Sequence, residues 1–172
     1  MTVSEATGDL FDQDTWTIRG EAYPYPVDVL GHGVNCQGFM GAGIANEFRK
    51  RYPEMYEKYK QMCDQDFLKP GMVYPWVDYT TLSGKPFWIF NIASQFNTGR
   101  AANINYLRAG LLSCRFYMED RGLNHLALPR IGAGIGGLSW NHVKSVVHDV
   151  FDDNSGCVDN QPHVTLVSLE GS

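Results

Sequence analysis

VDVLGHGVNCQGFMGAGIA, residues 27–45, passes from an apolar run with β-branched side chains into a glycine-rich turn. The run from Val27 to Val34 predicts a buried strand. From Gly41 to Arg51 the apolar side chains recur at helical spacing, which predicts a helix. The start of that helix offers unpaired backbone N–H groups and partial positive charge, and both favour an anion such as a phosphate.

HLALPRIGAGIGGLSW, residues 125–140, repeats the same order. A short apolar strand, His125 to Leu128, precedes a second glycine turn, and a helix is predicted over 141–151. Glycine lets the backbone adopt positive φ and pass close to a ligand. One such turn is a weak signal. Two in one chain indicate a diphosphate held from both sides, and hence a nucleotide-diphosphate ligand.

The rest of the chain alternates strands and helices. Further strands are predicted at 2–6, 72–77, 87–92 and 163–169, and further helices at 54–63 and 104–121, the latter ending at Gly122. The segment 12–26 contains Gly20, Pro24 and Pro26 and is interpreted as a surface excursion. This order predicts an α/β fold, a three-layer α/β/α sandwich around a mixed, mainly parallel six-stranded sheet. Ligands in such folds lie at the carboxyl ends of strands, where both glycine turns occur.

Composition describes an ordinary globular chain. Its 172 residues, 44% hydrophobic and 19% charged, predict a single domain over 1–172. No uncharged apolar run approaches the ~18 residues of a membrane span, and the first residues lack the pattern of a signal peptide, so a cytoplasmic location is expected. The formal net charge of -5 argues against a protein that coats nucleic acid non-specifically.

Cysteine spacing gives no metal site. Cys36, Cys63, Cys114 and Cys157 form no CxxC pair, and no histidine completes zinc spacing. Cys36 lies in the first glycine turn, where a helix N-terminus could lower its pKa. We expect a small buried side chain there, because no His–carboxylate pair marks a nucleophile.

Two nucleotide-binding classes compete for the second turn. Gly132, Gly134 and Gly137 satisfy the dinucleotide-binding pattern GxGxxG, which would indicate a dehydrogenase. That pattern normally follows the first strand of its unit and is followed by an acidic residue about 20 positions on, at the end of the next strand. Neither condition holds here. Neither turn ends in the Gly-Lys-Ser/Thr of a phosphate-binding ATPase loop.

The motifs together resemble the macrodomain family, the ADP-ribose-binding fold, over Glu5 to about Leu169. They are Gly8-Asp9-Leu10, Val34-Asn35-Cys36-Gln37-Gly38, Met40-Gly41-Ala42-Gly43-Ile44-Ala45, Leu128-Pro129-Arg130-Ile131-Gly132 and Leu138-Ser139-Trp140. They look like the branch that contains terminal ADP-ribose glycohydrolases and the bacterial enzymes that remove ADP-ribose from DNA bases. The resemblance implies ADP-ribose as the ligand, no cofactor, no metal, no membrane, an ADP-ribosylated protein or DNA as partner, and a monomer.

The resemblance also implies roles for single residues. Asp9 would accept a hydrogen bond from the adenine N6 amine, and Asn35 would hold the distal ribose. The implied ligand-binding set is Asp9, Leu10, Asn35, Gln37, Gly38, Met40, Gly41, Gly43, Ile44, Ile131, Gly132, Ala133, Gly134, Ile135, Gly136 and Gly137. Trp140 is expected to pack the start of its helix against the sheet. Phe39 and Trp88 are expected in the core, and Phe96, in a loop, is the better candidate for stacking on a ligand. His32 has two interpretations, a core histidine or a proton carrier near the distal ribose.

The chain departs from that branch at two catalytic positions. The place of the family's lysine falls on Gln95, next to Ser94, and glutamine cannot form a Schiff base. The place of an acidic residue in the second turn falls on Gly136. These residues resemble a bacterial subgroup that lacks the lysine. The catalytic candidates are therefore Asn35, Ser94 and Gln95, acting on a water. Two outcomes stay open: a hydrolase that cuts an ester to Glu or Asp or a bond to a nucleobase such as thymidine, and a reader that binds ADP-ribose without cutting.

Overall fold

The computed structural model describes residues 2–152 and 161–172, and Cys157 lies outside them. Its strands are β1 (Val3–Asp9), β2 (Asp12–Ile18), β3 (Glu21–Ala22), β4 (Val29–Val34), β5 (Val73–Asp78), β6 (Phe87–Ala93), β7 (His125–Leu128) and β8 (His163–Ser168). Its helices are α1 (Gly43–Arg51), α2 (Pro53–Asp64), α3 (Ile104–Arg121) and α4 (Trp140–Phe151).

The described strands form one sheet in the order β3-β2-β1-β8-β7-β4-β6-β5. The five central strands, β1, β8, β7, β4 and β6, run parallel to one another, whereas β2, β3 and β5 at the two edges pair in antiparallel fashion. The predicted mixed, mainly parallel sheet is therefore confirmed in class. The predicted count of six strands is wrong, because the segment interpreted as a surface excursion forms β2 and β3.

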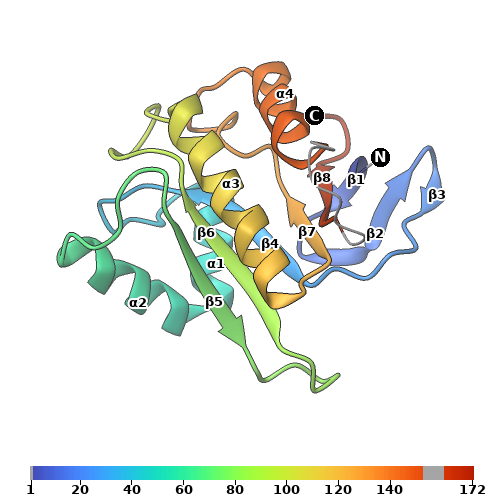
Figure 1. The fold of residues 1–172 in the computed structure, drawn as a ribbon, viewed down its shortest axis with the longest axis horizontal. Helices are drawn as coiled ribbons and strands as arrows, with labels where there is room; N and C mark the ends of the chain where they lie inside the picture. Colours follow the sequence, from blue (N-terminus) through green and yellow to red (C-terminus); the bar gives the residue numbers. More distant parts are fainter. Residues whose placement is uncertain (1, 153–160) are drawn as a thin grey trace.

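The strands bury both faces, and this produces three layers. Alternate residues enter different cores: Val29 packs with α3 and α4, whereas Leu30 packs with α1 and α2. In β7, Leu126 and Leu128 face the first of these cores and Ala127 the second. Figure 1 shows α3 and α4 in front of the sheet, with α1 on its far side. The predicted α/β/α sandwich is thus confirmed.

Helix ends follow the local sequence. The Asn103 side chain accepts hydrogen bonds from the backbone N–H groups of Asn105 and Tyr106, and Gly122 ends α3 with a φ of 66°. Pro53 occupies the first turn of α2, where no backbone donor is needed. The site is positioned by the parallel strands. Because they run in the same direction, all five end at the same edge of the sheet, and the loops that follow β1, β8, β7, β4 and β6 converge there.

Candidate functional site

A cavity of about 750 Å³ lies where the parallel strands end. This volume is in the range of small-molecule sites. The loop after each parallel strand contributes at least one lining residue: Leu10 after β1, Asn35 after β4, Gln95 after β6, Pro129 after β7 and Leu169 after β8. The cavity therefore collects side chains that are far apart in the sequence.

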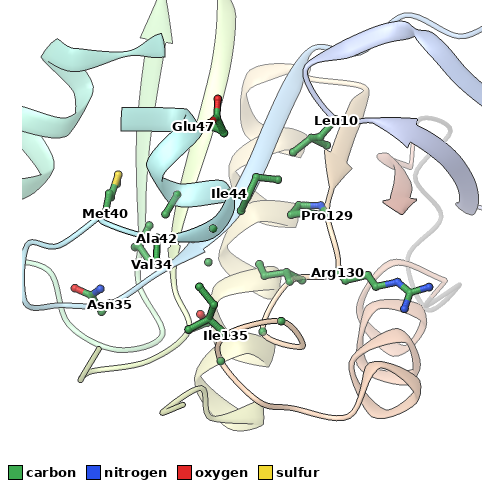
Figure 2. Close-up of a pocket in the computed structure, with 18 of the residues that line it drawn as sticks. Leu10, Val34, Asn35, Met40, Ala42, Ile44, Glu47, Pro129, Arg130 and Ile135 are labelled. Carbon is green, nitrogen blue, oxygen red and sulfur yellow. The ribbon is translucent and has the colours of Figure 1, made fainter. Parts of the chain in front are cut away.

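The start of α1 forms one wall of this cavity (Figure 2). Its N-cap residue, Ala42, supplies no side-chain hydrogen bond, and the first helical turn contains no acidic residue. The N–H groups of that turn, beginning at Gly43, are thus left to an external acceptor. With the helix dipole they favour a bound anion.

The second glycine turn forms the facing wall. Gly132, Gly134, Ile135 and Gly136 all line the cavity. Within this turn the N–H groups of Ala133 and Gly137 donate to the Arg130 and Gly134 carbonyls, respectively. The N–H groups of Gly134, Ile135 and Gly136 make no such bond within the described residues. The turn therefore presents a run of unpaired donors to the cavity, as an anion-binding loop requires.

The two walls touch at one point. A Cβ on Gly43 would lie 3.0 Å from Cδ1 of Ile135, and Gly43 has a φ of 60°. Ile135 is more than half exposed, so its side chain spans the cavity at the surface. A ligand lying between the turns would have backbone N–H donors on both sides and the Ile135 side chain between it and the solvent.

The Asn35 amide is largely occupied by its own turn and by α2. Its Oδ1 accepts from the N–H of Gln37 at 2.9 Å and from the Tyr59 hydroxyl at 2.9 Å, and its Nδ2 donates to the Phe39 carbonyl at 2.8 Å. One Nδ2 hydrogen remains. Asn35 thus fixes the first turn and keeps a single donor for a ligand.

Gln95 and Ser94 lie beside this turn. Gln95 Nε2 donates to the carbonyls of Asn97 and Gly99, at 2.6 and 3.0 Å, so only its Oε1 is free to accept a hydrogen bond from a ligand or a water. Ser94 is buried, and its hydroxyl has no hydrogen bond among the described residues. A Cβ on Gly33 would lie 2.7 Å from that Oγ, so the glycine leaves room for the hydroxyl.

Backbone contacts hold the three loops together. The Cys36 N–H donates to the Phe96 carbonyl at 3.0 Å, and the Ala102 N–H donates to the Gly136 carbonyl at 3.2 Å. The Gln95 loop is therefore tied to the first turn at one end and to the second turn at the other. The catalytic candidates Asn35, Ser94 and Gln95 all line the cavity, and the Cys36–Phe96 bond holds their two loops together.

Asp9 lies at the opposite end. Its Oδ1 accepts from the Phe11 N–H at 2.9 Å, which leaves Oδ2 without a partner among the described residues. Leu10 follows it and is buried. Figure 2 places Leu10 and Glu47 at one end of the cavity and Asn35 at the other.

The structure brings most of the predicted set together. Lining the cavity are Asp9, Leu10, Asn35, Met40, Gly41, Gly43, Ile44, Ser94, Gln95, Ile131, Gly132, Gly134, Ile135 and Gly136. Gln37, Gly38, Ala133 and Gly137 are not among the lining residues. Gly38 faces Lys60 and Cys63, and Gly137 faces Arg100, because successive residues of a turn point in different directions.

Sequence reasoning missed other lining residues: Gly8, Phe11, Gly33, Val34, Phe39, Ala42, Ala45, Glu47, Thr98, Gly99, Pro129, Arg130, Val167, Ser168, Leu169 and Ser172. Two signals could have found some of them. Ser168 and Leu169 stand at the carboxyl end of a parallel strand, and Glu47 lies one helical turn after Ile44, on the same face of α1. Arg130 points away from the cavity, where Nε donates to Ser168 Oγ.

Of the aromatic residues discussed above, some lie in the core and others at the surface. Phe39 is 62% exposed and lines the cavity, so its expected place in the core is wrong. Phe96 is exposed but is not a lining residue, and Trp88 packs against the core beside Tyr117. Trp140 packs against the same core, as expected.

His32 is a core residue. It is fully buried, and its ring stacks on the Phe48 ring with 3.9 Å between the ring centroids. Its Nε2 is 2.7 Å from Asn91 Oδ1. Burial lowers the pKa of His32 to about 4, and it is not a lining residue, so the proton-carrier interpretation is wrong. Cys36 is likewise buried, and burial beside Cys63 raises the pKa of its thiol to about 11.

Residues 2–152 and 161–172 contain neither a metal-binding cluster nor a membrane-spanning helix. Within them, no group of three or more His, Cys, Asp or Glu side chains is arranged to hold a metal ion. No helix in the same ranges is long and apolar enough to cross a membrane.

Comparisons of the sequence with family models and with curated proteins lead to the same family. The Macro domain model matches residues 32–147. A DNA ADP-ribosyl glycohydrolase of Thermus aquaticus is 30% identical over 141 residues, which is 81% of this chain and 38% of that protein. The chain thus spans well under half the length of this curated relative.

Solved structures agree. The macrodomain of Mycobacterium tuberculosis DarG superposes with a TM-score of 0.78 at 25% identity and covers 96% of both chains. Thermosipho africanus DarTG in complex with ADP-ribose gives a TM-score of 0.74 at 20% identity, over 96% of this chain and 41% of that one. The second likeness shows the fold alone.

Proposed function

The chain belongs to the Macro domain family, and from that premise we propose that it binds ADP-ribose in the cavity at the strand ends and removes ADP-ribose from an acceptor by hydrolysis. We also propose that residues 1–172 form one macrodomain. The observation that carries this proposal is the pair of facing glycine turns. Unpaired N–H groups line both sides of a groove, and a diphosphate is the group that would accept from both at once.

The cavity has a different chemistry at each end of that groove. At one end, Asp9 offers a free carboxylate oxygen beside the apolar Leu10 and Phe11, which suits a base with an exocyclic amine. At the other, Asn35, Ser94 and Gln95 offer neutral polar atoms, which suit a ribose and a water. We therefore propose that the adenosine lies at the Asp9 end and the scissile bond at the Asn35 end.

The proposed reaction is attack of water on C1″ of the distal ribose. The bond from C1″ to the acceptor breaks, the oxygen of water becomes the C1″ hydroxyl, and its proton passes to the departing acceptor. In this proposal Gln95 Oε1 accepts a hydrogen bond from the water, and the remaining Nδ2 hydrogen of Asn35 holds a ribose hydroxyl. No lysine is among the described residues that line the cavity, so the proposal includes no covalent intermediate on a lysine.

The acceptor is proposed to be a nucleobase or a protein carboxylate. The first choice draws on the relatives named as DNA ADP-ribosyl glycohydrolases. A second function, binding without turnover, is favoured by one observation. The titratable side chains of the lining are Asp9, Glu47 and Arg130, and Figure 2 places Glu47 and Leu10, the neighbour of Asp9, away from Asn35.

The experiment joins binding and turnover. Calorimetry with ADP-ribose tests the cavity assignment, and release of ADP-ribose from a thymidine-linked oligonucleotide and from a Glu-linked peptide tests the reaction. Activity that survives chelation of metals would support hydrolysis without a metal. The expectation of a cytoplasmic monomer also stays a prediction, which size-exclusion chromatography and cell fractionation test.

A further inference from the structure

Glu47 is an ionisable side chain of the cavity that the proposed function does not yet use. It lies on α1, one turn beyond Ile44, and both line the cavity. Its side chain is 47% exposed, and its Oε1 is 3.6 Å from Lys50 Nζ. An exposed pair at that distance contributes little, and Oε2 has no partner among the described residues. The carboxylate is therefore available to a ligand.

Contacts between elements place Glu47 at the Asp9 end of the cavity. The ring of Phe48, the next residue, lies 4.7 Å from that of Phe11, and the Arg51 guanidinium lies 4.3 Å above the Phe11 ring. The second turn of α1 thus packs against the segment that begins with Asp9. Figure 2 shows Glu47 and Leu10 on either side of this end.

The position also separates Glu47 from the anion site. A rise of 1.5 Å per residue puts it about 6 Å along the helix from Gly43, where the N–H groups attract the diphosphate. A carboxylate would repel phosphate and attract a hydrogen-bond donor. The walls nearby, Leu10, Phe11 and Ile44, are apolar, which suits a planar base better than a ribose.

We propose that Glu47 and Asp9 read the exocyclic amine of the adenine from two sides, each accepting one of its two hydrogens. This rests on the proposed function, because it assumes ADP-ribose as the ligand. Asp9 has one free oxygen, since its Oδ1 is bonded to the Phe11 N–H. It therefore takes one hydrogen of the amine, and the other falls to Glu47. Hypoxanthine, which has a carbonyl oxygen in place of the amine, would face two carboxylates and be rejected.

The test compares three ligands by calorimetry: ADP-ribose, its N6-methyl derivative, and inosine diphosphate ribose. The N6-methyl derivative keeps only one amine hydrogen. We expect it to bind the parent protein about tenfold more weakly than ADP-ribose, as the loss of one charge-assisted hydrogen bond predicts. In Glu47→Ala, ADP-ribose should weaken by about the same factor and the methyl penalty should largely disappear. Glu47→Gln, which can turn its amide towards a carbonyl, should bind the inosine ligand more tightly than the parent does.

Lys50→Ala is the matched control, because it removes the ion-pair partner and leaves Glu47 in place. It should bind all three ligands as the parent does. A methyl penalty that is unchanged in Glu47→Ala would overturn the inference and leave the proposed function standing. Failure of the parent to bind ADP-ribose at all would overturn both. Thermal unfolding of each variant verifies the fold, which Ala in a helix favours.

Discussion

Ile135 lies across the cavity from Gly43, with its Cδ1 3.0 Å from the point that a Cβ on Gly43 would occupy. The contact joins a turn after β4 to a turn after β7, although the two are about ninety positions apart in the sequence. The side chain is 55% exposed, at the mouth of the groove between the turns. Ile135 is therefore expected to govern the rate of ligand release.

Ile135→Ala should speed the dissociation of ADP-ribose about fivefold to tenfold, because the substitution removes the apolar contact over the groove. The side chain is 55% exposed, so the free energy of unfolding should change by less than about 0.5 kcal/mol. Stopped-flow displacement measures the first quantity and urea unfolding the second. An unchanged dissociation rate would show that the contact does not close the groove.

Gly134 allows the groove to be filled without disturbing the fold. A Cβ at Gly134 would meet nothing within 4 Å. Gly134→Ala should therefore fold normally, and Gly134→Glu should lose ADP-ribose binding, because its carboxylate would compete with the diphosphate for the N–H groups of the turn. Calorimetry on the two variants separates charge from the loss of a glycine. Tight binding by the Glu variant would place the diphosphate elsewhere.

Gln95 is expected to act on turnover more than on binding. Gln95→Ala removes the Oε1 acceptor and also the two bonds from Nε2 to the Asn97 and Gly99 carbonyls. We expect kcat to fall by about tenfold or more while the affinity for ADP-ribose changes little. Equal kcat in the variant and the parent would remove Gln95 from the mechanism.

Tyr59 supports Asn35 from α2. Its hydroxyl is 2.8 Å from the Asn35 carbonyl and 2.9 Å from Oδ1, and its single hydrogen serves these two acceptors, so Tyr59→Phe removes that donor at a cost of about 1–2 kcal/mol. Turnover should fall with it. Tyr56→Phe is the matched control, since the Tyr56 hydroxyl donates to the Gly38 carbonyl, outside the lining. Equal turnover in the two variants would contradict a special role for Asn35.

Stability should fall as pH decreases through the range of histidine titration. Burial lowers the pKa of His32 to about 4, and burial with the neighbouring His163 lowers that of His125 to about 4, against an ordinary 6.5. Between pH 6.5 and pH 4 the unfolded chain binds protons at these histidines that the folded chain does not. The free energy of unfolding therefore keeps the full contribution of the neutral histidines above about pH 6.5 and loses it as the pH falls towards 4. Urea unfolding from pH 7 to 5 should show this slope, and it should be smaller in His125→Gln. An identical slope in that variant would be evidence against the lowered pKa.

Much of the fold followed from local sequence signals. The limits of α3 and β7 were predicted as observed, because Gly122 ends the helix and a short apolar run marks the strand. β2 and β3 were missed because their sequence is polar and β2 buries only Trp16. In addition, Gly20, Pro24 and Pro26 are residues typical of loops. Both are strands because β2 pairs with β1 and β3 pairs with β2, and a local pattern contains no sign of this pairing.

The site divides in a similar way. Strand ends followed by glycine predicted the cavity walls at Asn35, Gly43 and Gly132, since parallel strands end together. The use of the Asn35 amide by Tyr59, 24 positions away, depends on how α2 packs and has no local signal. Glu47 could not be identified without the orientation of α1. Its spacing from Ile44 puts both residues on one helix face, but the sequence does not say that this face lines the cavity.

The central claim is that this cavity holds ADP-ribose and releases it from an acceptor without a lysine. The most direct measurement is single-turnover release of ADP-ribose from a thymidine-linked oligonucleotide and from a Glu-linked peptide, with Gly134→Glu as the inactive control. The account predicts release from at least one substrate by the parent protein and none by the variant. Tight binding of free ADP-ribose with no release from either substrate would contradict hydrolysis and leave a reader.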